Sequence, residues 1–194
     1  MAAYLQTLKE TYTDPGEALR IEWIDVDEKN CTIKINNPVK HHLPRQLKVS
    51  SRLITMINAL PRKNAKIFTT SYSALSSSFD RLRKTVANAQ QNPRILSVEL
   101  RSFRHFGGTM IAFYTHGNVL TVMKMLGLKE VKNAMKYIGD MSQFKDDEFD
   151  VQTATSFEEA KPLLASGYTY VQNIKELMVY TRPKRFSKFN VPGA

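Results

Sequence analysis

Arg101, Arg104 and Tyr137 are the residues of this sequence whose types can do chemistry together. Arginine stays charged in proteins, and its planar guanidinium group binds phosphate oxygens through two parallel hydrogen bonds. A tyrosine hydroxyl can serve as a nucleophile that forms a covalent intermediate. These residue types point to chemistry on a phosphodiester, provided that the fold brings them together.

Three helices are predicted to position these residues. The first begins near Leu100 and also carries His105. The second covers residues 119–126, where apolar residues recur at helical spacing, and Gly127 ends it. The third carries Tyr137 among Lys129, Lys132 and Lys136. A basic helical hairpin whose tyrosine packs or faces solvent is the simpler alternative, and spacing alone does not exclude it.

The bulk composition favours a globular protein with an anionic partner. The chain has 194 residues, of which 42% are hydrophobic, enough to bury a sizeable core. Its formal net charge is +10 and its sequence pI is about 9.7. Nucleic acid is the first partner that such a surplus suggests. A basic surface that serves only solubility is the alternative.

Cysteine and histidine usage argues against disulfides and metal. A single cysteine, Cys31, excludes an internal disulfide and fits the cytoplasm, where thiols stay reduced. The four histidines lack ligand spacing, so no metal site is predicted. No apolar run approaches the length of a membrane span and no signal peptide opens the chain, so no membrane association is expected.

The N-terminal segments predict two helices. Residues 3–10 read as the first. Asp14 is a good N-cap, Pro15 suits the first helical position, and Glu17 completes a capping-box pattern. The helix that they begin is expected to end near Trp23.

A small sheet is predicted next. After a turn at 25–30, residues 31–36 alternate and are rich in β-branched types, and residues 45–49 supply a return strand. The loop between the strands holds Lys40, His41 and His42.

Two further helices are predicted at 51–60 and 71–89, with a short edge strand at 66–69 between them. Arg81 and Arg83 on the longer helix are candidates for phosphate contacts, although a charged run on a helix is usually a solvated face.

The C-terminal segments predict a separate small module. The helix of Tyr137 is expected to reach about Phe144, followed by an acidic loop at 145–150. A capping box at Ser156 opens a helix that Gly167 stops, and a hairpin of 168–172 with 177–180 follows. The end of the chain is basic, with Arg182, Lys184, Arg185 and Lys188.

Two motifs carry a resemblance to a known family. RSFRHFGGTM at 101–110 and LGLKEVKNAMKYIG at 126–139 resemble the catalytic domain of tyrosine recombinases and integrases, above all their archaeal branch. That family carries H-x-x-R-H, then L-G-H, then a tyrosine nine residues on. Arg104 falls on the arginine of this pattern and Tyr137 on its nucleophile.

The sequence departs from the family pattern at three positions. Arg101 stands where the family has histidine, and Leu128 where it has histidine or tryptophan. Glu17 matches the glutamate of an R-x-G-E-like segment, but Asp14 replaces its arginine. Arg20 is no obvious substitute, because six residues along a helix place it on another face.

The resemblance implies a defined mechanism. The tyrosine attacks a DNA phosphate to give a 3′-phosphotyrosine link, and a lysine from the small sheet protonates the leaving 5′ oxygen, with no metal or nucleotide cofactor. Tyr137, Arg104 and Lys40 match, and Arg101 keeps a positive donor. An ordinary solvated loop lysine is the alternative for Lys40. Each lost donor costs about 10²–10³ in rate, so Asp14 and Leu128 predict attenuated activity.

The expected fold is α+β and mostly α-helical, like a tyrosine-recombinase catalytic domain, with a small N-terminal β-sheet and a C-terminal helix plus β-hairpin. Residues 1–145 are expected to form the catalytic-domain-like part, without the core-binding domain that precedes it in the family. Residues 146–194 are expected to form the acidic loop, helix, hairpin and basic tail.

Two functions stay open at this point. One is a site-specific recombinase or integrase that breaks and rejoins DNA. The other is a catalytically degenerate recombinase-fold protein that binds DNA without cutting it, natural or engineered. Whether the chain is an enzyme is therefore undecided. The expected partner is double-stranded DNA, with self-association on DNA left open and no small-molecule cofactor. Its expected DNA contacts are Arg81, Arg83, His105 and Lys132.

Overall fold

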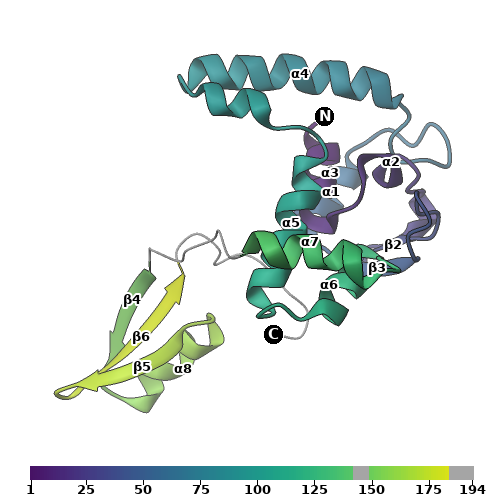
Figure 1. Ribbon diagram of the computed structural model, residues 1–194. Coiled ribbons are helices and arrows are strands. Elements are labelled where there is room, and N and C mark those ends of the chain that lie inside the picture. The colour runs from purple at the N-terminus through teal and green to yellow at the C-terminus, as the bar shows by residue number, and fades with distance from the viewer. Residues whose placement is uncertain (142–148, 184–194) are drawn as a thin grey trace. The chain divides into compact units, whose positions relative to one another are not determined.

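Helices dominate the first part of the chain and strands the second (Figure 1). This is a computed structural model, and it describes residues 1–141 and 149–183. The chain divides into two compact units, whose described parts are these two ranges.

The first unit is mostly helical. Its longer helices are α1 (Ala2–Thr11), α3 (Ser51–Asn58), α4 (Tyr72–Ala89), α5 (Ser102–Tyr114), α6 (Val119–Leu126) and α7 (Val131–Met141). Its short elements are α2 (Pro15–Ala18) and the 3-10 helices η1 (Trp23–Asp25) and η2 (Pro93–Ser97). Side chains cap several helices: those of Ser50, Ser71 and Asn118 accept the N–H of the residue three positions on.

A three-stranded antiparallel sheet completes this unit. Its strands are β1 (Val26–Asp27), β2 (Thr32–Ile35) and β3 (Arg45–Lys48), in that order. Ile33 pairs with Val26 on one side and Leu47 on the other, and its side chain is fully buried. The sheet thereby joins a core that includes Leu8, Leu53 and many other apolar side chains.

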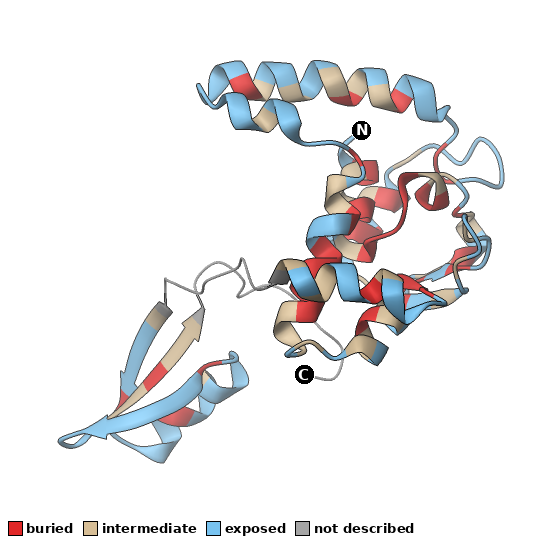
Figure 2. Cartoon of the chain, viewed as in Figure 1, coloured by how far each residue is buried: buried red, intermediate tan, exposed pale blue. Residues whose placement is uncertain are grey.

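Burial differs sharply between α4 and α5. Most of α4 is exposed, and Leu75, Phe79 and Ala87 are its buried residues (Figure 2). In α5, every residue from Gly107 to Ala112 is buried. Helix α5 is therefore a central element, against which α1, α6 and α7 pack.

The second unit is a small sheet with one helix. The strands β4 (Phe149–Ala154), β5 (Thr169–Ile174) and β6 (Leu177–Pro183) are antiparallel in the order β4-β6-β5, and α8 spans Phe157–Ala165. Ala154, Ala160, Tyr168 and Tyr180 form its small core.

Most of the predicted elements are confirmed. The helix at 119–126 has the expected bounds, and Gly127 follows it in the left-handed conformation with φ 68°. The capping box of Asp14 and Glu17 is present. The α+β class, the small sheet before α3 and the helix followed by a hairpin are also as expected.

Some predictions in the first unit are wrong. Helix α2 ends at Ala18 and does not reach Trp23, which begins a 3-10 helix. The expected turn at 25–30 contains strand β1. The expected edge strand at 66–69 is reduced to one bridge, between Lys66 and Glu22.

The second unit also differs from expectation. The acidic loop was expected to run to Asp150, but β4 begins at Phe149, and residues 145–148 lie outside the described range. The Ser156 hydroxyl caps α8 as expected and accepts the N–H of Glu159 at 3.4 Å, whereas the Glu159 carboxylate binds chiefly Thr155, whose N–H it accepts at 2.8 Å. Arg182 lies within β6, whereas Lys184, Arg185, Lys188 and the predicted helix end at Phe144 lie outside the described residues.

None of the helices in residues 1–141 and 149–183 combines the length and the apolar character that crossing a membrane requires.

Candidate active site

A pocket of about 510 Å³ in the first unit collects most of the residues with chemical potential. Its walls come from the N-cap of α2, the β2–β3 loop, the start of α5, the α6–α7 connection and α7. Asp14, Lys40, His41, His42, Arg101, Arg104, His105, Leu128, Lys129, Glu130, Asn133, Lys136 and Tyr137 line it.

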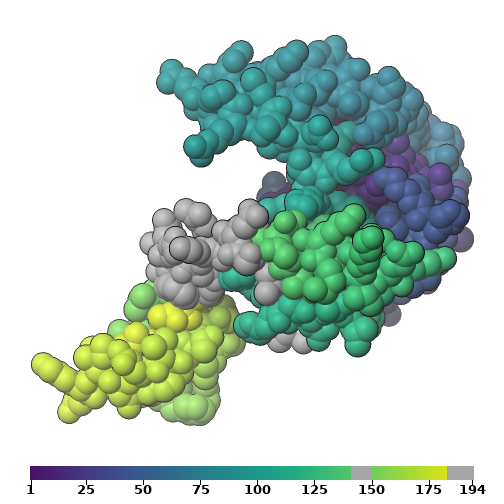
Figure 3. Space-filling model, in the orientation of Figure 1, coloured from purple at the N-terminus to yellow at the C-terminus, as the bar shows by residue number. Residues whose placement is uncertain are grey.

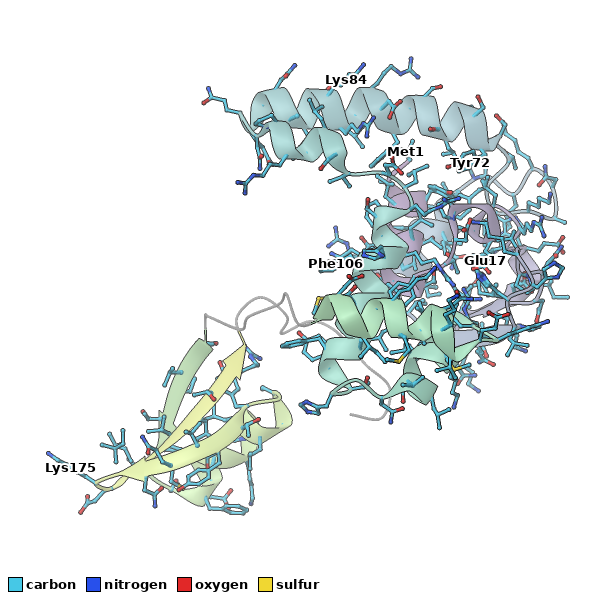
Figure 4. All side chains as sticks on the ribbon, in the orientation of Figure 1. Met1, Glu17, Tyr72, Lys84, Phe106 and Lys175 are labelled. Carbon is cyan, nitrogen blue, oxygen red and sulfur yellow. The ribbon has the colours of Figure 1, made fainter. Side chains whose placement is uncertain are left out.

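The buried carboxylate of Glu17 holds together the segments that form the pocket. Its side chain accepts hydrogen bonds from His42 Nδ1 at 2.8 Å, Arg45 NH2 at 2.6 Å and the backbone N–H of Asp14 at 3.0 Å. Burial alone would raise the pKa of Glu17, but the bonds from His42 and Arg45 and the charges of Arg45 and Arg104 lower it to about 2. Figure 4 shows Glu17 surrounded by other side chains. Glu17 is thus an ionised anchor that joins α2 to the β2–β3 loop and β3.

Arg104 forms part of the pocket floor and is held by the backbone. One N–H of NH1 donates to the carbonyl of Tyr12 and one of NH2 donates to that of Leu126, both at 2.9 Å. NH1 also lies 3.8 Å from Glu17 Oε2. Only 5% of the residue is exposed, and burial lowers the pKa of its guanidinium group. Since a guanidinium carries five N–H donors, some remain for a ligand.

Asp14 puts a negative charge on the wall of the pocket. Its Oδ2 accepts a bond of 2.8 Å from Lys40 Nζ, and its Oδ1 accepts the backbone N–H of Gly16. Burial raises its pKa, but these bonds and the charges of Lys40 and Arg101 outweigh burial and lower it. Asp14 and Lys40 therefore neutralise each other in this structure.

The connection between α6 and α7 fixes the β2–β3 loop beside the pocket. The N–H of Leu43 donates to the carbonyl of Gly127 at 2.8 Å. A Cβ on Gly127 would lie 2.6 Å from Leu43 O and 2.8 Å from Arg45 NH1. The following residue, Leu128, is buried and offers the pocket only an apolar wall. Glycine at 127 therefore meets two demands, a left-handed φ and a close backbone approach.

Tyr137 lies in the middle of α7 and is half-buried. Its ring is 5.7 Å from the ring of His105, centroid to centroid. His105 in turn lies 3.2 Å from Asp140 Oδ2 through its Nε2. The tyrosine and both arginines at 101 and 104 line the same pocket, as the phosphodiester hypothesis requires.

Other predicted contacts lie outside the pocket. Arg83 pairs with Asp80 and donates to the carbonyl of Val98, and it lines a separate hollow of about 400 Å³ between α4 and the segment before α5. The surface of the first unit is visibly hollowed between α4 and α7 (Figure 3). Arg81 is exposed on α4, and Lys132 is exposed on α7 without lining the pocket. Arg20 lies by a third hollow, consistent with its exclusion as a substitute for the first arginine.

Several pocket residues were not predicted. Glu130 and Asn133 follow the Gly127 stop at the start of α7 and line the pocket with Lys136 and Tyr137. Helical spacing from Tyr137 gives the signal, since positions four residues apart share a helix face. The contacts of Glu17 with His42 and Arg45 had no signal in sequence spacing, because they join segments 25 and 28 residues apart.

Sequence comparisons find no relative. No model of a known protein family matches the chain, and no curated protein matches it.

Solved structures do share the fold. A structure of the Tn1549 transposon integrase with a circular intermediate DNA superposes with a TM-score of 0.60 at 12% identity, over 84% of this chain and 57% of that chain. The XerH site-specific recombinase bound to its difH substrate gives 0.55 at 16% identity, over 70% and 41%. The XerA recombinase gives 0.51 at 16% identity, over 70% and 52%. The chain spans about half the length of these structures.

At sequence identities this low, a structural match shows the arrangement of helices and strands but not the chemistry of a site. The mixed helices and small antiparallel sheets match these neighbours over most of the chain. The chain therefore has the fold of a tyrosine-recombinase catalytic domain.

Proposed function

We propose that this chain is a double-stranded DNA-binding protein of the recombinase and integrase type, whose pocket breaks and rejoins DNA through a 3′-phosphotyrosine intermediate at an attenuated rate. The observation that carries the proposal is the shared pocket. Tyr137, Arg104 and Lys40 come from distant parts of the sequence and line one cavity. Because the motifs resemble the archaeal branch of the family, the proposal includes an archaeal-type protein. Because the chain has a single cysteine, it also includes a cytoplasmic location.

The charge distribution supports a nucleic-acid partner. Lys and Arg clearly outnumber Asp and Glu in residues 1–141, whereas the acidic residues slightly outnumber the basic ones in 149–183. The excess of positive charge thus lies in the unit that holds the pocket. Phosphates attract such a surface over roughly a Debye length, about 8 Å at physiological salt. The Tn1549 integrase and XerH structures also contain DNA.

Each residue has a role in the proposed step. The hydroxyl of Tyr137 loses its proton to water and its oxygen attacks the phosphorus, while the bond from phosphorus to the 5′ oxygen breaks. Arg101 and the remaining donors of Arg104 bind the non-bridging oxygens. The ammonium group of Lys40 gives a proton to the leaving 5′ oxygen. Asp14 opposes this step, because its carboxylate lies beside an anionic substrate and holds Lys40 at 2.8 Å.

A second function has its own support. The ion pair of Asp14 with Lys40 and the apolar wall of Leu128 favour a protein that binds DNA without cutting it. Losing one preorganised donor costs about 10²–10³ in rate, and two such positions are changed here.

A nicked suicide duplex tests the proposal. Cleavage at the nick releases a short fragment, so a tyrosine adduct accumulates and appears as a shifted band on a denaturing gel. We expect a slow adduct that Tyr137→Phe abolishes. Binding without any adduct would favour the second function, and no binding at low salt would contradict both.

A further inference from the structure

We propose that the glycine pair Gly107–Gly108 on α5 is a positioning device that seats the two tyrosines on which the pocket depends. We call the contact of the Tyr12 ring with Gly107, and that of the Tyr137 ring with Gly108, the two seats. The effect of the seats on catalysis rests on the proposed function, whereas the seats themselves are packing contacts.

Each glycine leaves room for one aromatic ring. A Cβ on Gly107 would lie 1.9 Å from Cδ1 of Tyr12, and a Cβ on Gly108 would lie 2.5 Å from Cδ1 and 2.6 Å from Cε1 of Tyr137. Carbon atoms in contact are normally about 3.5–4.0 Å apart. Both rings therefore lie against bare backbone, and no other residue type fits at either position without moving a ring.

The two seats face different directions. Successive residues on a helix point about 100° apart, since a turn takes 3.6 residues. Gly107 thus receives the end of α1, and Gly108 receives α7. Glycine within a helix costs about 0.5–1 kcal/mol relative to alanine, so two in succession within a buried helix require an offsetting benefit. Close packing of two rings supplies it.

The seat at Gly107 orients Arg104. Tyr12 ends α1 in the left-handed conformation with φ 51°, and its carbonyl accepts the NH1 donor of Arg104 at 2.9 Å. A ring fixed on Gly107 therefore fixes the carbonyl that aims the guanidinium group. Residue 104 is one turn before residue 107 on the same helix, so the seat and the arginine move together.

The seat at Gly108 sets the depth of Tyr137. The ring rests on Gly108 and has His105 beside it, and a Cβ on Gly108 would also lie 3.0 Å from Leu126 Cδ1. His105 reaches Asp140 on α7, which ties the two helices on either side of the ring. The ring therefore cannot approach α5 further, which limits how far the hydroxyl can move relative to the arginines.

The test compares Gly108→Ala with Gly139→Ala in the full chain. Residue 139 also lies in a pocket-forming helix, but a Cβ there meets no atom within 4 Å. Both variants gain the same helix propensity, and only Gly108→Ala pushes the ring, by about 1 Å if normal contact is restored. A misplacement of that size can cost about 10²-fold in rate.

Three measurements test the position of the Tyr137 ring, the rate of cleavage and the stability of the fold independently. With 3-fluorotyrosine incorporated, the ¹⁹F signal that Tyr137→Phe removes should shift in Gly108→Ala and stay in place in Gly139→Ala. The rate of adduct formation should fall about a hundredfold in Gly108→Ala alone. The melting temperature should fall in Gly108→Ala, yet rise when the same change is made in a Tyr137→Ala chain, because the ring that it displaces is gone.

The outcomes are distinguishable. An unmodified chain that forms no adduct would overturn the proposed cleavage, while the fluorine shift and the double-mutant comparison would still decide the seat. An unshifted signal, or equal destabilisation by Gly108→Ala with and without the Tyr137 ring, would overturn the seat.

Discussion

At the scale of single residues, the charge of Asp14 on the pocket wall opposes binding of an anion. Its carboxylate is a good N-cap for α2, which explains why a structural benefit accompanies the functional cost. An asparagine at this position would cap the helix equally well without the charge. Two unit charges about 4 Å apart in water interact by about 1 kcal/mol. We therefore expect Asp14→Asn to bind duplex DNA roughly fivefold tighter at fixed salt, as measured by fluorescence anisotropy.

A charge change elsewhere controls for net charge. Asp27→Asn removes the same formal charge outside the pocket, so it should change affinity much less. Equal gains in both variants would mean that the pocket is not where DNA binds. The larger change, Asp14→Arg, adds a bidentate donor and should make adduct formation faster than in the unmodified chain, and Tyr137→Phe should abolish it.

The buried carboxylate of Glu17 makes the stability of the first unit depend on pH. Its folded-state pKa is lowered from 4.5 to about 2. Its contribution is therefore fully present above about pH 4.5 and is lost as the pH falls toward 2. A shift of this size corresponds to about 3 kcal/mol. Glu17→Gln should lose about that much unfolding free energy at pH 7 and progressively less in acid.

Urea unfolding across this pH range, followed by the fluorescence of Trp23, measures the effect. Trp23 is the single tryptophan of the chain and lies in the first unit, so its signal reports on that unit. Glu28→Gln, an exposed substitution, should give a curve parallel to that of the unmodified chain. If the loss of unfolding free energy in Glu17→Gln did not become smaller toward pH 2, the stabilisation would not come from the charge of Glu17.

At the scale of elements, the stop after α6 determines where the β2–β3 loop lies. Gly127→Ala would force a side chain into a positive φ and within 2.6 Å of Leu43 O. Left-handed strain alone costs about 1–3 kcal/mol. We expect the unfolding free energy of the first unit, followed by Trp23 fluorescence, to fall by about 2 kcal/mol or more. DNA affinity should also fall, because Lys40 is displaced.

Gly167→Ala is the matched control. Its φ of 83° imposes the same kind of strain, but the added methyl group meets nothing within 4 Å and the residue belongs to the second unit. The transition of Trp23 should be unchanged in this variant. An unchanged transition in Gly127→Ala as well would show that the loop does not depend on this contact.

Local signals made several elements predictable and left others hidden. Residues 119–126 combine an Asn cap, apolar spacing and a glycine stop, so their bounds follow from sequence. The α2 helix carries an equally good start, but tertiary contacts end it at Ala18, since Ile21 joins Ile67 and Phe68 in the core. Strand β4 was hidden because its pairing partner, β6, lies far along the chain and because acidic residues precede it.

The sequence predicted several of the residues that line the pocket, but not the hydrogen bonds that hold them in place. Motif spacing placed Arg101, Arg104 and Tyr137 together, and the structure brings them to one cavity. Hydrogen bonds between distant segments leave no trace in spacing. The carbonyl partners of Arg104 and the bond between Lys40 and Asp14 therefore emerged only with the fold.

At the scale of the whole molecule, charge is divided unequally between the two units. The basic surplus of residues 1–141 has no counterpart in 149–183, where Asp150 pairs with Arg182 and Glu158 with Lys161. We thus expect the first unit to hold a DNA duplex, and residues 149–183 to add little to the electrostatic part of binding.

This division predicts how salt acts on each kind of variant. Every phosphate that the protein neutralises contributes about −0.9 to the slope of log K against log salt concentration. Lys136 lines the pocket, so Lys136→Gln should flatten the slope by about one and weaken binding to all sequences alike. Lys175 lies at the hairpin tip of the second unit (Figure 4), so Lys175→Gln should leave both slope and affinity unchanged. Anisotropy titrations of the full chain at several salt concentrations measure both. Equal flattening by the two variants would mean that DNA contacts the second unit as closely as the pocket.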